Sequence, residues 1–173
     1  MMAGLLDPTD GVVRRGASGT VRASAVFQDL IHYPLTVRQN VALAAPEVQP
    51  TDERIMEALQ AADAERLVAD LVHGLDTLLQ RDSAGGTDLS GGQWQRIAIA
   101  RAIYAAHAGR ELVILDEPTA NLDVRAEAAF YEKVVRSLPN VTVVLILPPA
   151  VHGASCGPDR DVVRGPDRRG WHP

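Results

Sequence analysis

The stretch Leu112-Val113-Ile114-Leu115-Asp116-Glu117 joins a continuous apolar run to two carboxylates. An unbroken apolar run of this length is typical of a parallel β-strand that is buried on both faces. Ligands of open parallel sheets bind at the carboxyl ends of the strands, where these two acids would lie. One carboxylate can hold Mg²⁺, and the next can orient or deprotonate an attacking water. The alternative is a pair of acids that only face solvent at a strand end.

A second stretch, Leu89-Ser90-Gly91-Gly92-Gln93, predicts a helix that begins with an anion-binding end. Ser90 and Gln93 have the spacing of a capping box, which marks a helix N-terminus. The two glycines remove side chains where backbone N–H groups approach an anion, and the helix dipole adds a favourable field. A flexible joint is the alternative. Together the two stretches indicate nucleoside triphosphate chemistry, although the chain contains no G-x-x-x-x-G-K-[ST] loop.

The composition excludes several other classes of protein. With 173 residues, 46% of them hydrophobic and 23% charged, the chain is ordinary for one globular domain. A net charge of −5 argues against a nucleic-acid-binding surface, because no basic excess is present to meet phosphates. The single cysteine, Cys156, excludes an internal disulfide and favours a reducing compartment. No apolar stretch approaches the roughly 18 residues that span a bilayer, so a membrane role would require a partner.

The apolar pattern predicts an α/β fold in which helices and strands alternate. The expected elements are a strand at 25–27 that ends at Gln28, a helical turn within 36–45, a helix N-capped by Thr51 with Ile55, Leu59 and Ala62 on one face, a helix at 64–72 ended by Gly74, a long helix from Ser90 to Gly109, a strand at 112–115, a helix capped by Asp123 with Ala126, Phe130 and Val134 as its buried stripe, and a strand at 141–147. The last strand, helix and strand would form one right-handed βαβ unit.

The other polar residues give weaker signals. Gln28 can touch a metal or its water, but most glutamines at strand ends are only polar termini. Asp123 can cap a helix or reach across an interface, and capping is the default. The spacing of the histidines at 32, 73 and 107 is unlike that of metal ligands. Trp94 is expected to be a packing anchor rather than a base-stacking platform.

Taken together, these segments resemble the nucleotide-binding domain of ABC transporters. The resemblance covers residues 26–147 in family order and is closest to the exporter type. The matching motifs are the Q-loop at Val26-Phe27-Gln28-Asp29, the signature at Leu89–Gln93 continued by Gln95-Arg96 and Ala100-Arg101-Ala102, the Walker B strand at Leu112–Asp116, the catalytic glutamate at Glu117 and the D-loop at Asn121-Leu122-Asp123.

The resemblance implies part of the core sheet of a P-loop ATPase with a helical subdomain at about residues 40–108. It also implies ATP and Mg²⁺ as cofactors, and a second ATPase domain as a head-to-tail partner. In that arrangement the signature residues bind the partner's ATP, whereas Glu117 is the catalytic residue for the chain's own ATP. The cofactor-binding residues would be Gln28, Ser90, Gly91, Gly92, Gln93, Asp116 and Asp123, with Gln28 and Asp116 also binding the metal.

The same resemblance implies a place in the cell and a kind of partner. Gln28 would communicate with a transmembrane transporter domain, which would hold the chain at the cytoplasmic face of the plasma membrane. No nucleic-acid partner is expected. The implied function is an ATP-binding and ATP-hydrolysing subunit that powers transmembrane transport. The alternatives are a non-catalytic remnant that pairs with an intact ATPase domain, and an ABC-type ATPase of DNA repair, whose long coiled coils have no counterpart here.

Three parts of the family pattern are missing from the sequence. The phosphate loop with its lysine and the adenine-stacking aromatic residue would lie before residue 1, and Leu147-Pro148-Pro149 replaces the usual Ser-His-Arg of the switch histidine. With suitable synonymous codons, the gene segment that encodes residues from Leu147 onward could, in a neighbouring reading frame, encode a sequence like the C-terminal part of the family's domain. The expected organisation is therefore a partial ATPase domain over 1–147 and a disordered or out-of-frame tail over 148–173. Because loss of a single preorganised donor can cost about 10²–10³ in rate, the chain is expected to be inactive alone.

Overall fold

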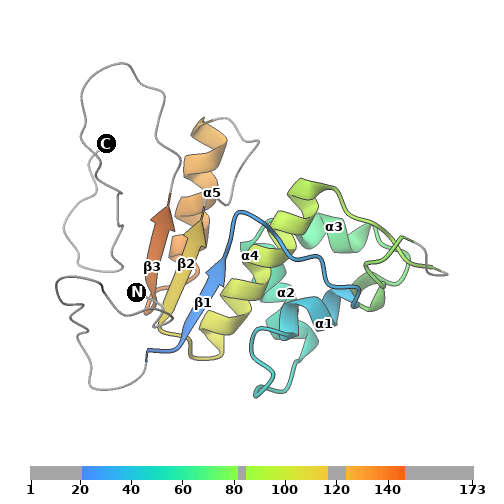
Figure 1. Cartoon of the computed structure of the whole chain (residues 1–173), viewed down its shortest axis with the longest axis horizontal. Coiled ribbons are helices and arrows are strands. Elements are labelled where there is room, and N and C mark those ends of the chain that lie inside the picture. Colours follow the sequence, from blue (N-terminus) through green and yellow to red (C-terminus); the bar gives the residue numbers. More distant parts are fainter. Residues whose placement is uncertain (1–20, 82–84, 117–123, 147–173) are drawn as a thin grey trace.

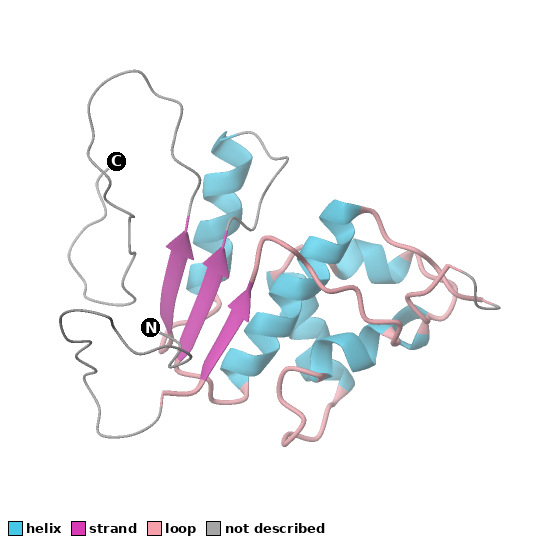
Figure 2. Cartoon of the chain, viewed as in Figure 1, coloured by secondary structure: helices cyan, strands magenta, loops and turns pink. Residues whose placement is uncertain are grey.

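A computed structural model describes residues 21–81, 85–116 and 124–146 of the chain. These residues form a three-stranded parallel sheet with helices packed against it (Figures 1 and 2). The elements, in chain order, are β1 (Ala23–Val26), α1 (Val37–Ala42), α2 (Asp52–Ala61), α3 (Glu65–Ala69), the 3₁₀ turn η1 (Gly74–Asp76), α4 (Gly91–His107), β2 (Leu112–Asp116), α5 (Val124–Arg136) and β3 (Thr142–Ile146). Figure 1 shows α1–α4 gathered beyond β1, on the side away from β3.

The sheet has the order β1-β2-β3, so β2 is its central strand. Val113 and Leu115, on one face of β2, are fully buried. On the other face Leu112 is buried but Ile114 is only half-buried, so the predicted burial on both faces is only partly present. In register, Leu115 lies between Val26 of β1 and Leu145 of β3. Because β2 and β3 are parallel neighbours joined through α5, the predicted strand–helix–strand unit is confirmed. The carboxyl ends of the three strands therefore meet at one edge of the sheet.

Helix α4 is the centre of the helical part. It packs against α1 and α2 on one side and against β1 and β2 on the other. Its buried residues are Trp94, Ile97, Ala98, Ile99, Ala100, Ala102, Ile103, Tyr104, Ala105 and Ala106. A helix that is apolar almost all round is a buried helix, and its many alanines let neighbouring elements approach closely.

The end of α4 forms a Schellman motif. Gly109 has a φ of +97° and donates its N–H to the carbonyl of Ala106, while Arg110 donates to Ala105. Gly109 therefore ends the helix as predicted, since the left-handed backbone at this position favours glycine.

Two predicted elements differ from the structure. The helix expected at 64–72 is shorter, because α3 ends at Ala69. Gly74 does not end it but begins η1 with a φ of +52°. The reason is a turn held by Thr77, whose buried hydroxyl oxygen accepts the N–H of His73. The strand expected at 25–27 instead covers Ala23–Val26, and the side chain of Phe27 is 59% exposed.

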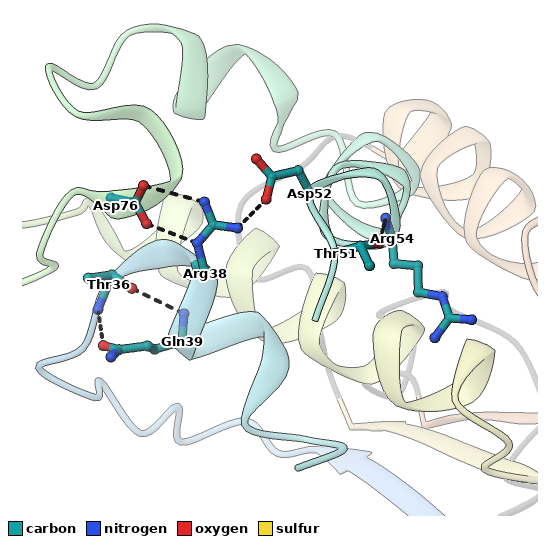
Figure 3. A network of polar contacts seen from close by, with 7 residues as sticks. All are labelled: Thr36, Arg38, Gln39, Thr51, Asp52, Arg54 and Asp76. Carbon is teal, nitrogen blue, oxygen red and sulfur yellow. Dashed lines mark hydrogen bonds and ion pairs between the residues drawn. The ribbon is translucent and has the colours of Figure 1, made fainter. Parts of the chain in front are cut away.

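Polar caps and one ion-pair network hold the short helices together (Figure 3). Thr36 and Gln39 form a capping box at the start of α1. At the start of α2 the Thr51 hydroxyl accepts the N–H of Arg54, which confirms the predicted N-cap. Arg38 of α1 donates from Nε to the Asp76 carboxylate at 2.9 Å and from Nη1 to the carboxylate of Asp52. One guanidinium thus joins α1, α2 and η1.

We expect the contribution of Asp76 to stability to depend on pH. Hydrogen bonds from Arg38 hold the pKa of Asp76 below its ordinary value. The resulting stability is present above the unfolded-state pKa of about 4 and is lost as pH falls through the lower folded-state pKa. In urea titrations of the full chain, Asp76→Asn should lower the unfolding midpoint at neutral pH. In acid, the difference in unfolding midpoint between the variant and the wild type should disappear.

The matched control is Asp70→Asn, which changes an exposed aspartate that makes no side-chain hydrogen bond or ion pair within the described residues. It should leave the midpoint unchanged or higher at both pH values, because a carboxylate at the end of α3 opposes the helix dipole. An Asp76→Asn deficit of equal size in acid would contradict the linkage.

Candidate functional site

The N-terminus of α4 is capped by its own side chains. The Ser90 N–H donates to Gln93 Oε1 at 2.8 Å, and the Gln93 N–H donates to Ser90 Oγ at 3.3 Å. The predicted capping box is therefore present. Ser90 is exposed, and its hydroxyl proton is free to donate outward because the oxygen serves the helix only as an acceptor.

Gly91 and Gly92 are the first two residues of α4, and both are exposed. Neither has a positive φ, and a Cβ built on either would meet nothing within 4 Å. In the middle of a helix glycine costs about 0.5–1 kcal/mol relative to alanine, and its greater backbone freedom is unfavourable in the first turn as well. Nothing in the described residues requires glycine at these two positions. Their N–H groups have no carbonyl within the helix to receive them. The helix therefore presents open backbone donors, aided by its dipole, at an end suited to an anion.

A second group of predicted site residues lies at the carboxyl edge of the sheet. Asp116 is the last residue of β2 and lies in register with Ile146 of β3. Gln28 is exposed and follows β1 by two residues, and the last residue of that strand is in register with Leu115. The structure thus places both residues at or just beyond the same edge of the sheet. Glu117 and Asp123 lie outside the described residues.

The chemistry of this edge suits a hard cation in part. Carboxylate and amide oxygens are the ligands that Mg²⁺ prefers, usually together with waters and phosphate oxygens. In the part of the chain that the structure describes, no group of three or more histidine, cysteine, aspartate or glutamate side chains is placed to hold a metal. Asp116 and Gln28 would therefore hold Mg²⁺ only as part of a shared shell that includes the phosphates of a nucleotide.

The helix N-terminus and the sheet edge face the same way. Because α4 runs back against the direction of the strands, its N-terminal end and the strand carboxyl ends lie toward the same side of the molecule (Figure 1). Within residues 21–81, 85–116 and 124–146, no hydrogen bond or ion pair joins Ser90 to Asp116. The two groups are separate features of one face.

The prediction that Trp94 packs in the core is confirmed. Trp94 is 3% exposed and stacks on His32, with ring centroids 4.4 Å apart and planes 7° from parallel. It is a packing anchor. His73 and His107 are exposed, and a ring nitrogen of His107 lies 3.1 Å from the Ser137 carbonyl oxygen.

Sequence reasoning missed a buried polar pair. It named Arg101 in the continuation of the signature motif and predicted no contact between Arg101 and Asn40. The structure buries Asn40 completely and joins it to Arg101 through two hydrogen bonds of 3.0 Å. No local signal marks such a pair, because its partners are far apart in the sequence.

Comparison with known proteins settles the family. The family model described as ABC transporter matches residues 1–120. The chain belongs to the ABC transporter family. The predicted resemblance and the α/β fold class are thereby confirmed.

Individual relatives of this ABC transporter family member are named as transport proteins. The chain is 32% identical over 155 residues to the nisin transport ATP-binding protein NisT of Lactococcus lactis subsp. lactis, covering 84% of this chain and 25% of that one. It is 38% identical over 120 residues to the type I secretion system ATP-binding protein PrsD of Rhizobium meliloti (strain 1021), covering 68% and 19%. The chain therefore spans a quarter or less of these relatives.

A solved structure agrees with this assignment. An ATP-bound bacterial Atm1-family ABC exporter superposes with a TM-score of 0.59 at 25% identity, covering 73% of this chain and 21% of that one. Among the described residues, no helix has both the length and the apolar character needed to cross a membrane.

We expect Ser90→Ala to lower the free energy of unfolding by about 1 kcal/mol, because it removes the cap of α4. Ser90→Asp should keep the stability near the wild-type value, since aspartate caps as well as serine and its charge favours a helix N-terminus. Urea denaturation followed by circular dichroism measures both. Wild-type stability in Ser90→Ala would mean that the capping box contributes nothing.

Proposed function

We propose that this chain carries part of the ATPase of an ABC exporter, in which ATP binding and hydrolysis drive transmembrane transport. The observation that carries the proposal is the exposed Ser90-Gly91-Gly92 start of α4. These glycines lower the stability of the helix and have no steric reason within the described fold. Close approach of a phosphate from outside the chain supplies the reason.

The anion in this proposal is the triphosphate of an ATP bound to a second ATPase domain, packed head to tail. Ser90 would donate its hydroxyl proton, and Gly91 and Gly92 their backbone N–H groups. Gln93 uses its side-chain oxygen in the capping box, which leaves its amide NH₂ free to donate. The absence of a hydrogen bond or ion pair between Ser90 and Asp116, within the described residues, supports this assignment of the two groups to different nucleotides.

The sheet edge would serve the chain's own nucleotide. Asp116 and Gln28 would hold Mg²⁺, which supplies charge neutralisation to the phosphates. Glu117, directly after Asp116, would orient and deprotonate the attacking water. Asp123 would contact nucleotide across the interface between the two domains. Phosphoryl transfer needs mainly positioning and charge stabilisation, which these residue types provide.

The domain organisation belongs to the same proposal. Residues 1–147 would be a partial ATPase domain, with a helical subdomain at about 40–108 that includes most of α1 to α4, and residues 148–173 a tail without a role in the site. The membrane partner would be a transmembrane transporter domain, which would hold the chain at the cytoplasmic face of the membrane. The names of the relatives, a transport ATP-binding protein and a secretion ATP-binding protein, support this.

We expect the purified full chain to release no phosphate from ATP above background. The sequence contains no G-x-x-x-x-G-K-[ST] loop, so it lacks that lysine and cradle of N–H groups. Losing even one preorganised donor costs about 10²–10³ in rate. A colourimetric phosphate assay with Mg²⁺ measures this, and steady turnover that persists through repeated purification would contradict it.

We also expect the chain to complete the nucleotide site of an intact partner. The partner is an exporter ATPase domain with its own phosphate loop and with its catalytic glutamate changed to glutamine, so that ATP persists. Sedimentation velocity should show a heterodimer with Mg²⁺-ATP but not with Mg²⁺-ADP. Ser90→Asp keeps the helix cap but sets a negative charge against the triphosphate, so it should abolish the heterodimer.

Two further variants make the test specific. Gly92→Ala has room for its methyl group and should stabilise the chain, yet it should weaken the heterodimer by about tenfold because it blocks close approach of the phosphate. Gln49→Glu adds the same charge as Ser90→Asp at an exposed loop position and should bind as the wild type does. Wild-type association by Ser90→Asp would overturn the proposal.

A further inference from the structure

The loop between β1 and α1 carries Gln28 near its start. Asn40 of α1 contacts the end of this loop. This side chain is completely buried. Its Nδ2 lies 3.1 Å from the carbonyl oxygens of Tyr33 and Leu35 and 3.2 Å from that of Thr36. One amide group therefore lies within hydrogen-bond reach of three carbonyls at the end of the loop and the start of α1, which holds the backbone of residues 33–36.

Arg101 of α4 holds this arrangement from the other side. Its Nε donates to the Asn40 carbonyl oxygen and its Nη2 to Asn40 Oδ1, both at 3.0 Å. The guanidinium carbon lies 4.8 Å from the centre of the Tyr33 ring, within the range of a cation–π contact. Arg101 thus contacts both Asn40, which binds the end of the loop, and Tyr33 in the loop itself.

A structural role alone explains Arg101 poorly. Burial lowers the pKa of Arg101, because the charged form is desolvated, and within the described residues its hydrogen-bond partners are all neutral. Burying a charge without an opposite charge beside it is costly. What the guanidinium adds is direction, since its planar fork holds two oxygens and one ring at fixed angles.

A second contact joins the same loop to the same helix. His32 stacks on Trp94, which lies in the first turn of α4 next to Gln93. Trp94 and Arg101 are seven residues apart, so they lie on one face of α4, two turns from each other. The loop therefore contacts α4 both near its N-terminus and in its middle.

We propose that Asn40 and Arg101 are positioning residues that lock the loop carrying Gln28 onto α4, so that the loop and the Ser90-Gly91-Gly92 end move as one body. The consequence rests on the proposed function. There, Gln28 serves the chain's own Mg²⁺-nucleotide and the N-terminus of α4 serves the partner's. A rigid link between them makes occupancy of one nucleotide site a bias on the other, which is a coupling between two distinct sites.

The lock itself is tested without nucleotide or partner. In a Trp171→Phe background, Trp94 is the only tryptophan of the chain, so acrylamide quenching of its fluorescence reports its cover by His32. Arg101→Lys keeps the charge but loses the fork. It should increase quenching of Trp94, which it does not touch, and speed hydrogen exchange of residues 31–36 by about tenfold.

The matched control is Arg96→Lys on the same helix. Arg96 is exposed and donates to the Asp63 carbonyl at 2.7 Å, away from the loop. It should change neither quenching nor exchange at 31–36. His32→Ala changes an exposed residue, so it leaves the core intact. It should expose Trp94 directly. If Arg101→Lys does not fold, hydrogen exchange of residues 31–36 in His32→Ala tests whether the loop is held on α4.

The consequence is tested in the heterodimer with the intact ATPase domain. Arg101→Lys should weaken the ATP-dependent association by about tenfold while its fold, judged by circular dichroism, is retained. If the wild-type chain forms no heterodimer, the proposed function fails, and quenching and exchange still decide the lock. If the wild type associates and Arg101→Lys shows unchanged exchange, quenching and affinity, the positioning role is wrong.

Discussion

Burial of α4 is the constraint on which the rest of the structure depends. The helix packs against α1 and α2 and against β1 and β2, so it is the element that joins the helices to the sheet. Its alanines allow this close packing on several faces at once, and its larger apolar residues, such as Ile97 and Ile103, fill the core. Because the helix cannot shift without opening that core, its two ends are fixed in space. A capping box fixes the first end and a Schellman motif the second.

That rigidity suits the N-terminus of α4 to the phosphate-binding role that we propose for it. A phosphate site needs open backbone donors held still, and the first turn of a firmly buried helix provides both. Gly91 and Gly92 lower the stability of the helix while leaving space above it. Local rules of stability are commonly broken where function requires it, and this is the clearest such position in the described chain. The sheet edge with Asp116 and Gln28 faces the same side of the molecule (Figure 1).

Some elements were predictable because their signals are local. The predicted capping box of Ser90 and Gln93 depends on residues three positions apart, and the β2 strand depends on an unbroken apolar run. The boundaries of α3 and η1 were not predictable in this way. They depend on a hydrogen bond from the His73 backbone to Thr77, which competes with further helix, and periodicity does not register that competition. The contact between Asn40 and Arg101 was not predictable for a stronger reason. The two residues come from different helices and meet only after folding.

The sequence by itself determined the family, the alternation of elements and the identity of the residues at the strand and helix ends. These follow from short-range chemistry, namely apolar periodicity, helix capping and motifs of adjacent residues. Only the tertiary structure decided which of these ends face the same side, that the glycine pair stands in open space, and that a buried guanidinium ties the Gln28 loop to α4. Those properties depend on where distant segments come to lie once the core is buried, and no local pattern encodes that distance.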